Sequence, residues 1–419
     1  MNLTDTMEYI NSMPRFIEKP VLEVMKTVLC TLDNPQDKLK FIHVAGTNGK
    51  GSACAYISSI AKCAGLTVGK FTSPYVVDFR ERFQINDRMI SKSYLCEITT
   101  QVKSILDELG EDYLLPQFAL ITVIGFLYFL KNNCDVVVLE VGLGGRTDPT
   151  NIIKNPLCSV IMQIGLDHTD RLGDNIGQIA FEKGGIIKPN GKTVLYPIQK
   201  EQTVNVIRSM SIQSNSKFIQ TRTDDIKNIN YSLTGATFTY KGEYYEIGIS
   251  GKCQPYNALT AIEAINASLP DITTDIIKKG LKNAQIPARL QVIRQSPALV
   301  VDGGHNEDAV NVLIDFILRN KIKPICVIGM SKDKDIKTFI HKIGPLCREI
   351  HTVQVDSPRA ETAENIATLA QIYCSTVKPH SDFDKLIDEM LSKDDDLLIC
   401  GSLYVANYAL NAIKSKFDI

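Results

Sequence analysis

Short apolar runs rich in β-branched residues alternate along this chain with segments of helical length. Runs that are apolar on both faces are typical of parallel strands covered by helices. The alternation therefore predicts a doubly wound α/β architecture. The clearest expected strands are 40–45, 135–141, 159–164, 298–301, 324–328, 350–355 and 396–399.

The segment 217–250 has a different pattern and interrupts this alternation. Residues 236–240 and 243–249 flank Lys241-Gly242, which predicts a β-hairpin. Helical periodicity returns at 256–267, and the pattern breaks again near 285–289, where a second strand–helix series begins. We therefore expect a larger N-terminal domain, 1–286, with a small β-hairpin subdomain, and a smaller Rossmann-like C-terminal domain, 287–419.

The composition narrows the classes of function. The chain has 419 residues and a net charge of −1, so nothing in its charge suggests nucleic acid as a partner. The apolar run 119–130 is shorter than the ~20 residues that span a bilayer, so a buried helix is expected there and no membrane partner. The start of the chain has no signal-peptide pattern, and the eleven cysteines show no C-x-x-C spacing. Reduced, mostly buried thiols in a cytoplasmic protein are the expectation.

The strongest local signal is a glycine-rich segment that joins an expected strand to an expected helix at 53–64. It reads Ile42-His43-Val44-Ala45-Gly46-Thr47-Asn48-Gly49-Lys50-Gly51-Ser52. Glycines let backbone N–H groups approach phosphate oxygens, and the helix N-terminus adds partial positive charge. Lys50 is expected near the β and γ phosphates and Ser52 near Mg²⁺. The alternative is a glycine-rich turn that binds no ligand.

One departure from the common phosphate loop is informative, because Gly51 separates Lys50 from Ser52. In this form the loop resembles that of the Mur-type ligases, and most of all the folylpolyglutamate synthase and dihydrofolate synthase family. Further segments match that family in order along most of the chain. They are Thr72-Ser73-Pro74, Glu81-Arg82, Glu140-Val141-Gly142-Leu143-Gly144-Gly145-Arg146, Asp148-x-Thr150-Asn151, Leu166-Asp167-His168-Thr169, Glu182-Lys183, Gln254-Pro255-Tyr256-Asn257-Ala258, Pro287-x-Arg289, Asp302-Gly303-Gly304-His305-Asn306, Asp333-Lys334-Asp335 and Gly401-Ser402.

The resemblance implies an ATP-dependent carbon–nitrogen ligase and a monomer. Its substrates would be ATP, L-glutamate and a folate or dihydropteroate, whose carboxylate is activated as an acyl-phosphate. Activity on tetrahydrofolate alone, without the dihydrofolate synthase step, is the first alternative. A Mur-type ligase for another carboxylate and an ATP-binding regulatory protein with a decayed site are more distant alternatives.

The resemblance also implies the metal ligands. Ser73, Glu140 and His168 match the family's Mg²⁺ ligands, together with Ser52. Glu140 is notable by itself, because a carboxylate at the end of a buried strand needs a metal or an ion-pair partner. Lys183 matches a lysine that is carbamylated in the family and helps to hold a second Mg²⁺. The alternative for Lys183 is a solvated lysine on a helix that begins near Phe181.

The remaining site residues follow from the same resemblance. ATP contacts are expected from the loop residues 46–52 and from Asn257, Arg289, Asp302 and His305. Arg289 suits the role of a γ-phosphate clamp, because guanidinium binds anions in a bidentate manner. The residues expected to be catalytic are Lys50, His168, Lys183 and Arg289. Ser402 is expected on the glutamate side, and Arg82, Phe118, Arg146 and Asp148 on the substrate side.

Three departures from the family pattern fall on the pterin side. Tyr75 replaces a histidine, Ala119 replaces an acid, and Thr147 and Pro149 flank Asp148 in place of Leu and Ala. Phe118 and Asp148 remain, so a pterin ring can still be stacked and oriented, although Phe118 also suits a place in the core. These departures leave open whether dihydropteroate is accepted.

Overall fold

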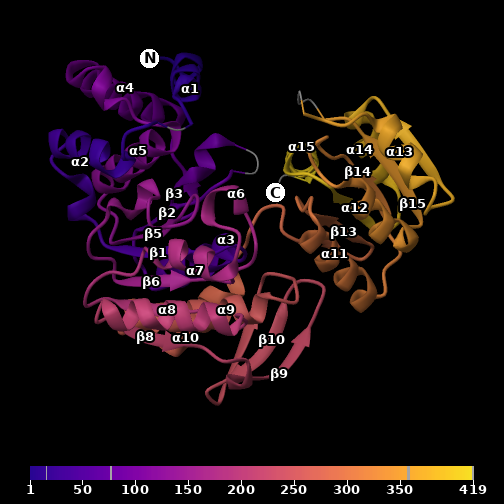
Figure 1. Ribbon diagram of the computed structural model, residues 1–419. Helices are drawn as coiled ribbons and strands as arrows, with labels where there is room; N and C mark the ends of the chain where they lie inside the picture. The colour runs from indigo at the N-terminus through magenta and orange to yellow at the C-terminus, as the bar shows by residue number, and fades with distance from the viewer. Residues whose placement is uncertain (16, 76–77, 356–358, 418–419) are drawn as a thin grey trace. The chain divides into compact units, whose positions relative to one another are not determined.

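The computed structural model describes the chain except for residues 16, 76–77, 356–358 and 418–419 (Figure 1). It divides into two compact units. Unit 1 consists of Met1–Asn228, Phe238–Tyr245 and Pro255–Ala284, and unit 2 of Ile229–Thr237, Glu246–Gln254 and Gln285–Ile419.

An eight-stranded sheet with the order β4-β3-β2-β5-β1-β6-β7-β8 forms the centre of unit 1. The strands β2, β5, β1, β6, β7 and β8 are parallel, and β3 and β4 form an antiparallel edge. In register, Val44 on β1 pairs with Glu140 on β5, so both strands end at the same edge of the sheet. The strands are β1 Phe41–Ala45, β2 Val68–Phe71, β3 Phe83–Ile85, β4 Arg88–Met89, β5 Val136–Glu140, β6 Cys158–Ile161, β7 Lys192–Leu195 and β8 Lys217–Gln220.

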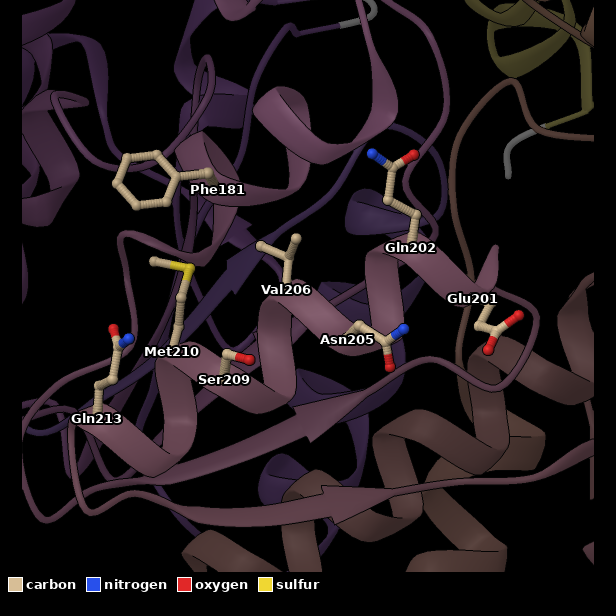
Figure 2. Close-up of a pocket in the computed structure, with 8 residues that line it drawn as sticks. All are labelled: Phe181, Glu201, Gln202, Asn205, Val206, Ser209, Met210 and Gln213. Carbon is tan, nitrogen blue, oxygen red and sulfur yellow. The ribbon is translucent and has the colours of Figure 1, made fainter.

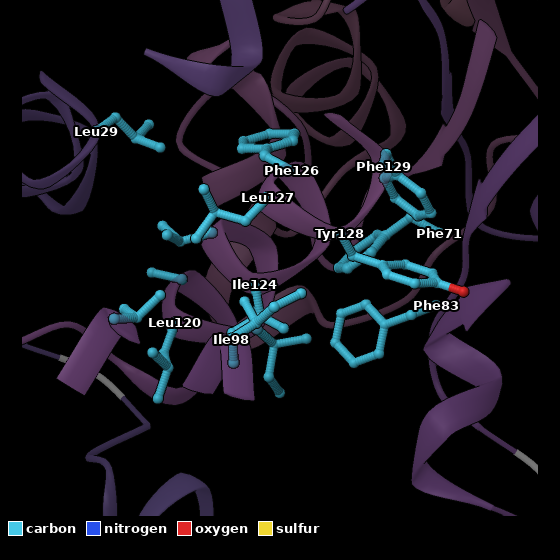
Figure 3. Packing of buried hydrophobic residues seen from close by; sticks show 14 of the residues in the cluster. Leu29, Phe71, Phe83, Ile98, Leu120, Ile124, Phe126, Leu127, Tyr128 and Phe129 are labelled. Atoms are coloured by element: carbon cyan, nitrogen blue, oxygen red, sulfur yellow. The ribbon is translucent and has the colours of Figure 1, made fainter. Parts of the chain in front are cut away.

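Among the helices in the first part of the chain, α5 explains much of the core. Helix α5 is apolar around its whole circumference and is buried from Ala119 to Phe129, as expected for a helix inside a core. Figure 3 shows its side chains packed with aromatic residues of the strands, and the rings of Phe41 and Phe126 lie 5.5 Å apart. The helices are α1 Leu3–Ser12, α2 Val21–Thr31, α3 Lys50–Cys63, α4 Lys92–Leu109, α5 Gln117–Lys131, α6 Thr169–Leu172, α7 Ile176–Gly184, α8 Glu201–Gln213, α9 Gln254–Ser268 and α10 Thr274–Asn283.

A second sheet of three strands has the order β11-β10-β9, with β9 Ile226–Tyr231, β10 Ala236–Tyr240 and β11 Glu243–Ile247. Its hairpin turns at Lys241 and Gly242, which both have positive φ. This is the predicted β-hairpin, and its residues are divided between the two units.

Unit 2 is built on a six-stranded sheet with the order β12-β13-β17-β14-β15-β16, parallel except for β12. The strands are β12 Gln291–Gln295, β13 Ala298–Val301, β14 Ile325–Ile328, β15 Glu349–Val353, β16 Val377–His380 and β17 Leu397–Cys400. The helices are α11 Glu307–Asn320, α12 Ile336–Ile343, α13 Ala363–Ala370, α14 Phe383–Ser392 and α15 Leu403–Phe417.

The predicted α/β class is confirmed in both units, and the expected strands are present with ends that differ by a few residues. One prediction about a helix is wrong.

Helix α7 begins at Ile176 and not near Phe181, because Asn175 caps it by accepting the N–H of Gln178 at 3.0 Å. None of the eleven cysteines, all of which the structure describes, forms a disulfide, and eight of them are buried. In the described part of the chain, no helix combines the length and the apolar character needed to cross a membrane.

Candidate active site

Residues 46–52 form the turn from β1 into α3, and two glycines make this turn possible. Gly46 has a φ of +155°, and a Cβ there would lie 2.6 Å from Cβ of Met162. Gly49, with a φ of +86°, is the N-cap of α3, and a Cβ there would lie 2.8 Å from Oδ1 of Asn257. Asn257, predicted as an ATP contact, is thus buried against the loop. Neither position leaves room for a larger side chain.

The backbone of the loop is held by a residue that the motif does not include. The N–H groups of Thr47 and Asn48 donate to the carbonyl oxygen of Gln163, at 2.7 and 3.2 Å. This anchor leaves the first turn of α3 at the end of the sheet, where helix N–H groups and the helix dipole favour an anion. Sequence reasoning missed Gln163, because a backbone carbonyl gives no signal in the residue type.

Two lysine side chains meet at the same loop carbonyl. Lys50 donates through Nζ to the carbonyl oxygens of Gly46, at 2.9 Å, and of Thr47, at 3.3 Å. Lys183, on α7, donates through Nζ to the carbonyl oxygen of Gly46 at 3.0 Å. Burial, followed by the charge of Lys50, lowers the pKa of Lys183 to about 8. Only 4% of Lys183 is exposed, so the alternative of a solvated lysine is wrong.

Glu140 and Ser73 are brought together beside this helix terminus. Glu140 is buried at the end of β5, and its Oε2 accepts the backbone N–H of Ser73 at 3.1 Å. The pKa of Cys54, in the first turns of α3, shows that Glu140 is close to this helix. Burial raises the pKa of the Cys54 thiol, Glu140 raises it further, and Lys70 and Lys50 oppose the shift. The carboxylate of Glu140 therefore lies near the helix that follows the phosphate loop.

Arg82 lies in the same region and is mostly enclosed. Burial lowers the pKa of Arg82, whereas Tyr75 and Glu140 oppose this shift. Its guanidinium carbon lies 5.3 Å from the ring centre of Tyr75 and 5.6 Å from that of Phe79. Within the described residues, its buried Nε and Nη1 atoms have no hydrogen-bond partner. A buried donor pair of this kind is suited to an anionic ligand.

The predicted Mg²⁺ ligands are brought together only in part. Oxygen ligands such as the carboxylate of Glu140 and the hydroxyl of Ser73 fit this ion, and Ser52 lies in the first turn of α3. His168 is exposed at the start of α6, with Nε2 3.8 Å from Oδ2 of Asp167. Over the described residues, no group of three or more His, Cys, Asp or Glu side chains is arranged to hold a metal ion.

Phe118 and Asp148 are brought together at Gly142, just after β5. A Cβ on Gly142 would lie 2.5 Å from Cε1 of Phe118 and 3.2 Å from Oδ2 of Asp148. The rings of Phe118 and Phe71 lie 5.9 Å apart, so Phe118 also packs at the edge of the core. Asp148 is buried, and burial raises its pKa against several hydrogen bonds that lower it. An aromatic ring and a carboxyl group beside one glycine can bind a flat heteroaromatic ligand, the ring by stacking and the carboxyl group by hydrogen bonds.

Arg146 lies on the outer side of the same turn and is tied to α7. Its Nε and Nη2 contact Oε1 of Glu182 at 3.0 and 2.9 Å, and its backbone N–H donates to the carbonyl oxygen of Glu182 at 2.8 Å. Gly185 lies against this backbone, because a Cβ there would lie 2.5 Å from Cα of Arg146. The turn that carries Asp148 is therefore fixed to the helix that carries Lys183.

Unit 2 holds the other predicted residues. Asp302, buried after β13, accepts the N–H of Leu290 through Oδ2 at 2.8 Å and that of Gly304 through Oδ1 at 2.7 Å. Nδ1 of His305 lies 3.1 Å from the carbonyl oxygen of Gly303, and burial lowers its pKa, with Lys334 and Arg289 acting in the same direction. Arg289 is exposed. Ser402 is buried before α15 and accepts the N–H of Val405 at 3.1 Å.

A separate pocket of about 570 Å³ lies between α7 and α8 (Figure 2). Figure 2 shows Phe181 on α7 facing a row of α8 side chains that includes Val206 and Met210. None of the predicted site residues lines this pocket. Lys183, which is also on α7, is buried and does not face it.

Comparison with known proteins identifies the class. Residues 44–265 match the family described as Mur ligase middle domain, and residues 288–403 match Mur ligase, glutamate ligase domain. The chain is 34% identical to dihydrofolate synthase/folylpolyglutamate synthase of Bacillus subtilis, over 96% of both chains. It is 32% identical to folylpolyglutamate synthase of Lacticaseibacillus casei, over 97% of both.

Solved structures agree with these relatives. Folylpolyglutamate synthase of Thermotoga maritima superposes with a TM-score of 0.88 at 29% identity, covering 98% of this chain and 96% of that one. An FPGS–AMPPCP–folate complex has a TM-score of 0.82 at 30% identity, covering 99% and 100%. The fold and the matching family models therefore define a Mur-type ligase. Within that class, the chain belongs to the dihydrofolate synthase and folylpolyglutamate synthase family, and the predicted family, fold and enzyme class are confirmed.

Proposed function

We propose that this ligase joins L-glutamate to tetrahydrofolate and to dihydropteroate at the expense of ATP. The acceptor carboxylate attacks the γ-phosphorus of ATP, which gives an acyl-phosphate and ADP. The amine of glutamate then attacks the acyl carbon, phosphate leaves, and an amide bond forms. In this proposal residues 1–286 bind the nucleotide and the acceptor, and residues 287–419 form the glutamate-ligase domain.

The observation that carries the proposal is the meeting of Lys50 and Lys183 at the carbonyl oxygen of Gly46, beside the N-terminus of α3. The first step brings a carboxylate towards a polyphosphate, so the site must supply positive charge. Lys50 directs an ammonium group at this neutral carbonyl, as does Lys183 before any carbamylation, which leaves most of their charge uncompensated locally. An ATP phosphate chain in the loop would supply that compensation.

The ligands of related solved structures support the proposal. One related structure is a complex of FPGS with AMPPCP and folate. By the same likeness, Gly46 to Ser52 would bind the triphosphate of ATP. Asn257 in unit 1 would contact ATP. In unit 2, Asp302, His305 and Arg289 are also proposed as ATP contacts, with Arg289 as the γ-phosphate clamp, and Ser402 would contact glutamate.

Mg²⁺ belongs to the proposal as well. Glu140 and Ser73 would hold it, with Ser52 and His168, and the ion would neutralise charge on the phosphates. Lys183 is suited to carbamylation, because a pKa of about 8 keeps part of its amine neutral near neutral pH. In that reaction the neutral amine attacks CO₂, a carbamate forms and one proton is released. Its carboxylate would then serve a second Mg²⁺.

On the acceptor side, Phe118 would stack on the pterin and Asp148 would accept hydrogen bonds from it, since both lie at Gly142. Arg82 and Arg146 would attract the acidic end of the substrate. Cysteines without disulfides suit a reducing compartment, so we place the protein in the cytoplasm. We also propose that it acts as a monomer.

The test is ADP release by the full-length protein with ATP, Mg²⁺ and L-glutamate, comparing dihydropteroate with tetrahydrofolate. Turnover with both acceptors establishes the bifunctional activity and shows that Tyr75 and Ala119 are tolerated. Turnover with tetrahydrofolate alone makes the protein a folylpolyglutamate synthase only. ATP binding without glutamate-dependent turnover on either acceptor would overturn the proposal.

A further inference from the structure

His43 is the most deeply buried histidine near the site, and the proposed chemistry gives it no role. It lies in the middle of β1, and 0% of its surface is exposed. Burial, helped by the charge of Lys188, lowers the pKa of His43 to about 3, so the ring is neutral at physiological pH. Its Nε2 lies 2.9 Å from Oγ1 of Thr150, whereas its buried Nδ1 has no hydrogen-bond partner among the described residues.

Thr150 connects this ring to Asp148. Its hydroxyl lies 2.5 Å from Oδ1 of Asp148, and its backbone N–H donates to the same oxygen at 2.9 Å. The other oxygen of Asp148, Oδ2, accepts the N–H of Leu143 at 2.9 Å. Each carboxylate oxygen therefore receives at least one hydrogen bond inside a buried turn. These bonds favour the ionised form, although burial outweighs them and leaves the pKa of Asp148 above its ordinary value.

These contacts determine the direction of the hydrogen bonds. Oδ1 of Asp148 already accepts the N–H of Thr150, and in the ionised form the carboxylate can only accept, so the hydroxyl proton of Thr150 points to Asp148. Oγ1 of Thr150 then accepts a hydrogen bond from Nε2–H of His43. The neutral ring has one N–H, so Nδ1 carries no proton, which agrees with the lack of an acceptor near it among the described residues. The sequence of donors runs from His43 through Thr150 to Asp148.

We propose that His43 and Thr150 are positioning residues that hold the carboxylate of Asp148 in one orientation towards the acceptor. The inference rests on the proposed function for the identity of the acceptor, a pterin beside Phe118. Oδ2 of Asp148 faces Gly142, against which Phe118 packs, and Oδ1 is turned away and anchored by the hydroxyl. Because His43 lies on β1, which leads into the phosphate loop, the carboxylate of Asp148 is tied to the strand that places Lys50.

Matched variants separate positioning from general structural support. Thr150→Val removes the hydroxyl and keeps the shape, whereas Thr150→Ser keeps the hydroxyl. We expect Thr150→Val to raise KM for the acceptor about tenfold, and KM for ATP less than about twofold, as for one lost charge-assisted hydrogen bond. Thr150→Ser should restore KM for the acceptor. His43→Leu should act in the same direction, and His43→Gln, which places an N–H donor near the position of Nε2, should restore it.

The ring of His43 gives a second readout that does not depend on turnover. Nitrogen-15 NMR of the full chain should show Nε2 protonated and Nδ1 unprotonated from pH 8 to pH 5, and both signals should move in Thr150→Val. A ring protonated on Nδ1, or equal rises in KM for ATP and for the acceptor in Thr150→Val, overturns the proposal. So does an unchanged KM for the acceptor in Thr150→Val. If the protein turned over no pterin, the proposed function would fail, and the NMR readout would still decide the hydrogen-bond direction.

Discussion

Lys183 and Lys188 are both buried lysines, and comparing their variants tests whether the contact of Lys183 with the phosphate loop matters for activity. Burial is the main reason that both have a pKa lowered to about 8. Lys183 donates to Gly46 in the phosphate loop, whereas Lys188 donates to the carbonyl oxygen of Asn151 at 3.1 Å. We expect Lys183→Met to lower glutamate-dependent ADP release at least about 100-fold, because the polar contact with the loop and the amine proposed for carbamylation are both lost. Lys188→Met should retain activity within about tenfold. Equal losses in two folded variants would contradict a special role for Lys183.

A pair of histidines in unit 2 gives a prediction for pH. Nδ1 of His351 on β15 lies 2.8 Å from Nε2 of His380 on β16, and Nε2 of His351 lies 3.2 Å from Oε2 of Glu349. Burial lowers the pKa of both rings. Glu349 opposes this shift at His351 and Glu389 opposes it at His380, whereas Lys393 adds to it at both and Lys378 at His380.

Because the folded-state pKa values are lowered, folding favours the neutral rings. Their contribution to stability is therefore present above pH 6.5 and is lost as the pH falls below it. Between pH 7.5 and 5.5, the native chain should lose more unfolding free energy than His380→Gln, because glutamine takes up no proton; the exposure of His380 to solvent keeps this difference small. Urea unfolding at the two pH values measures this difference. An equal loss in both proteins would show that the protonation of His380 does not change on unfolding.

At the scale of elements, the turn into α3 depends on Gly49 and not on Gly51. Gly49 has positive φ, and a Cβ there would lie 2.8 Å from Asn257, whereas a Cβ at Gly51 would have no neighbouring atom within 4 Å. Gly49→Ala should therefore lower the unfolding free energy by about 1–3 kcal/mol. Gly51→Ala should leave it unchanged or raise it slightly, since alanine is a better helix former at this position. Thermal unfolding of the two variants without nucleotide checks this, and equal losses would count against the described turn.

The elements also show what the sequence could and could not predict. Strand β5 and helix α5 were predictable, because each is a continuous apolar run that only a buried element tolerates. Helix α7 was predicted to begin too late, although its N-cap residue, Asn175, is a recognisable signal. The burial of Lys183 was not predictable, because it depends on Gly46, which is far away in the sequence. The same holds for the anchoring of the loop by the backbone of Gln163.

At the scale of the whole molecule, the two units are interleaved in sequence. Residues 229–237 and 246–254 belong to unit 2, although a single boundary at 286 would assign them to the first domain. Leu233 in the first of these segments packs against the apolar core of unit 2. Between the two segments, the stacked rings of Phe238 and Tyr245, 5.4 Å apart, belong to unit 1. Local periodicity predicts a hairpin here, but long-range packing decides to which unit each residue belongs.

Nucleotide binding to the phosphate loop should raise the stability of the folded chain. A ligand that binds only the folded state stabilises it by about 2.7 kcal/mol at 100 times its Kd. We therefore expect AMPPCP with Mg²⁺ to raise the temperature of the unfolding transition that includes unit 1, which contains the loop. Lys50→Ala should abolish most of this shift, because Lys50 places its ammonium group at the loop carbonyls. Lys38→Ala, which removes an exposed ion pair with Asp33, should keep the full shift. If Lys50→Ala kept the full shift as well, the nucleotide would bind without this lysine, and the loop would lose its assigned role.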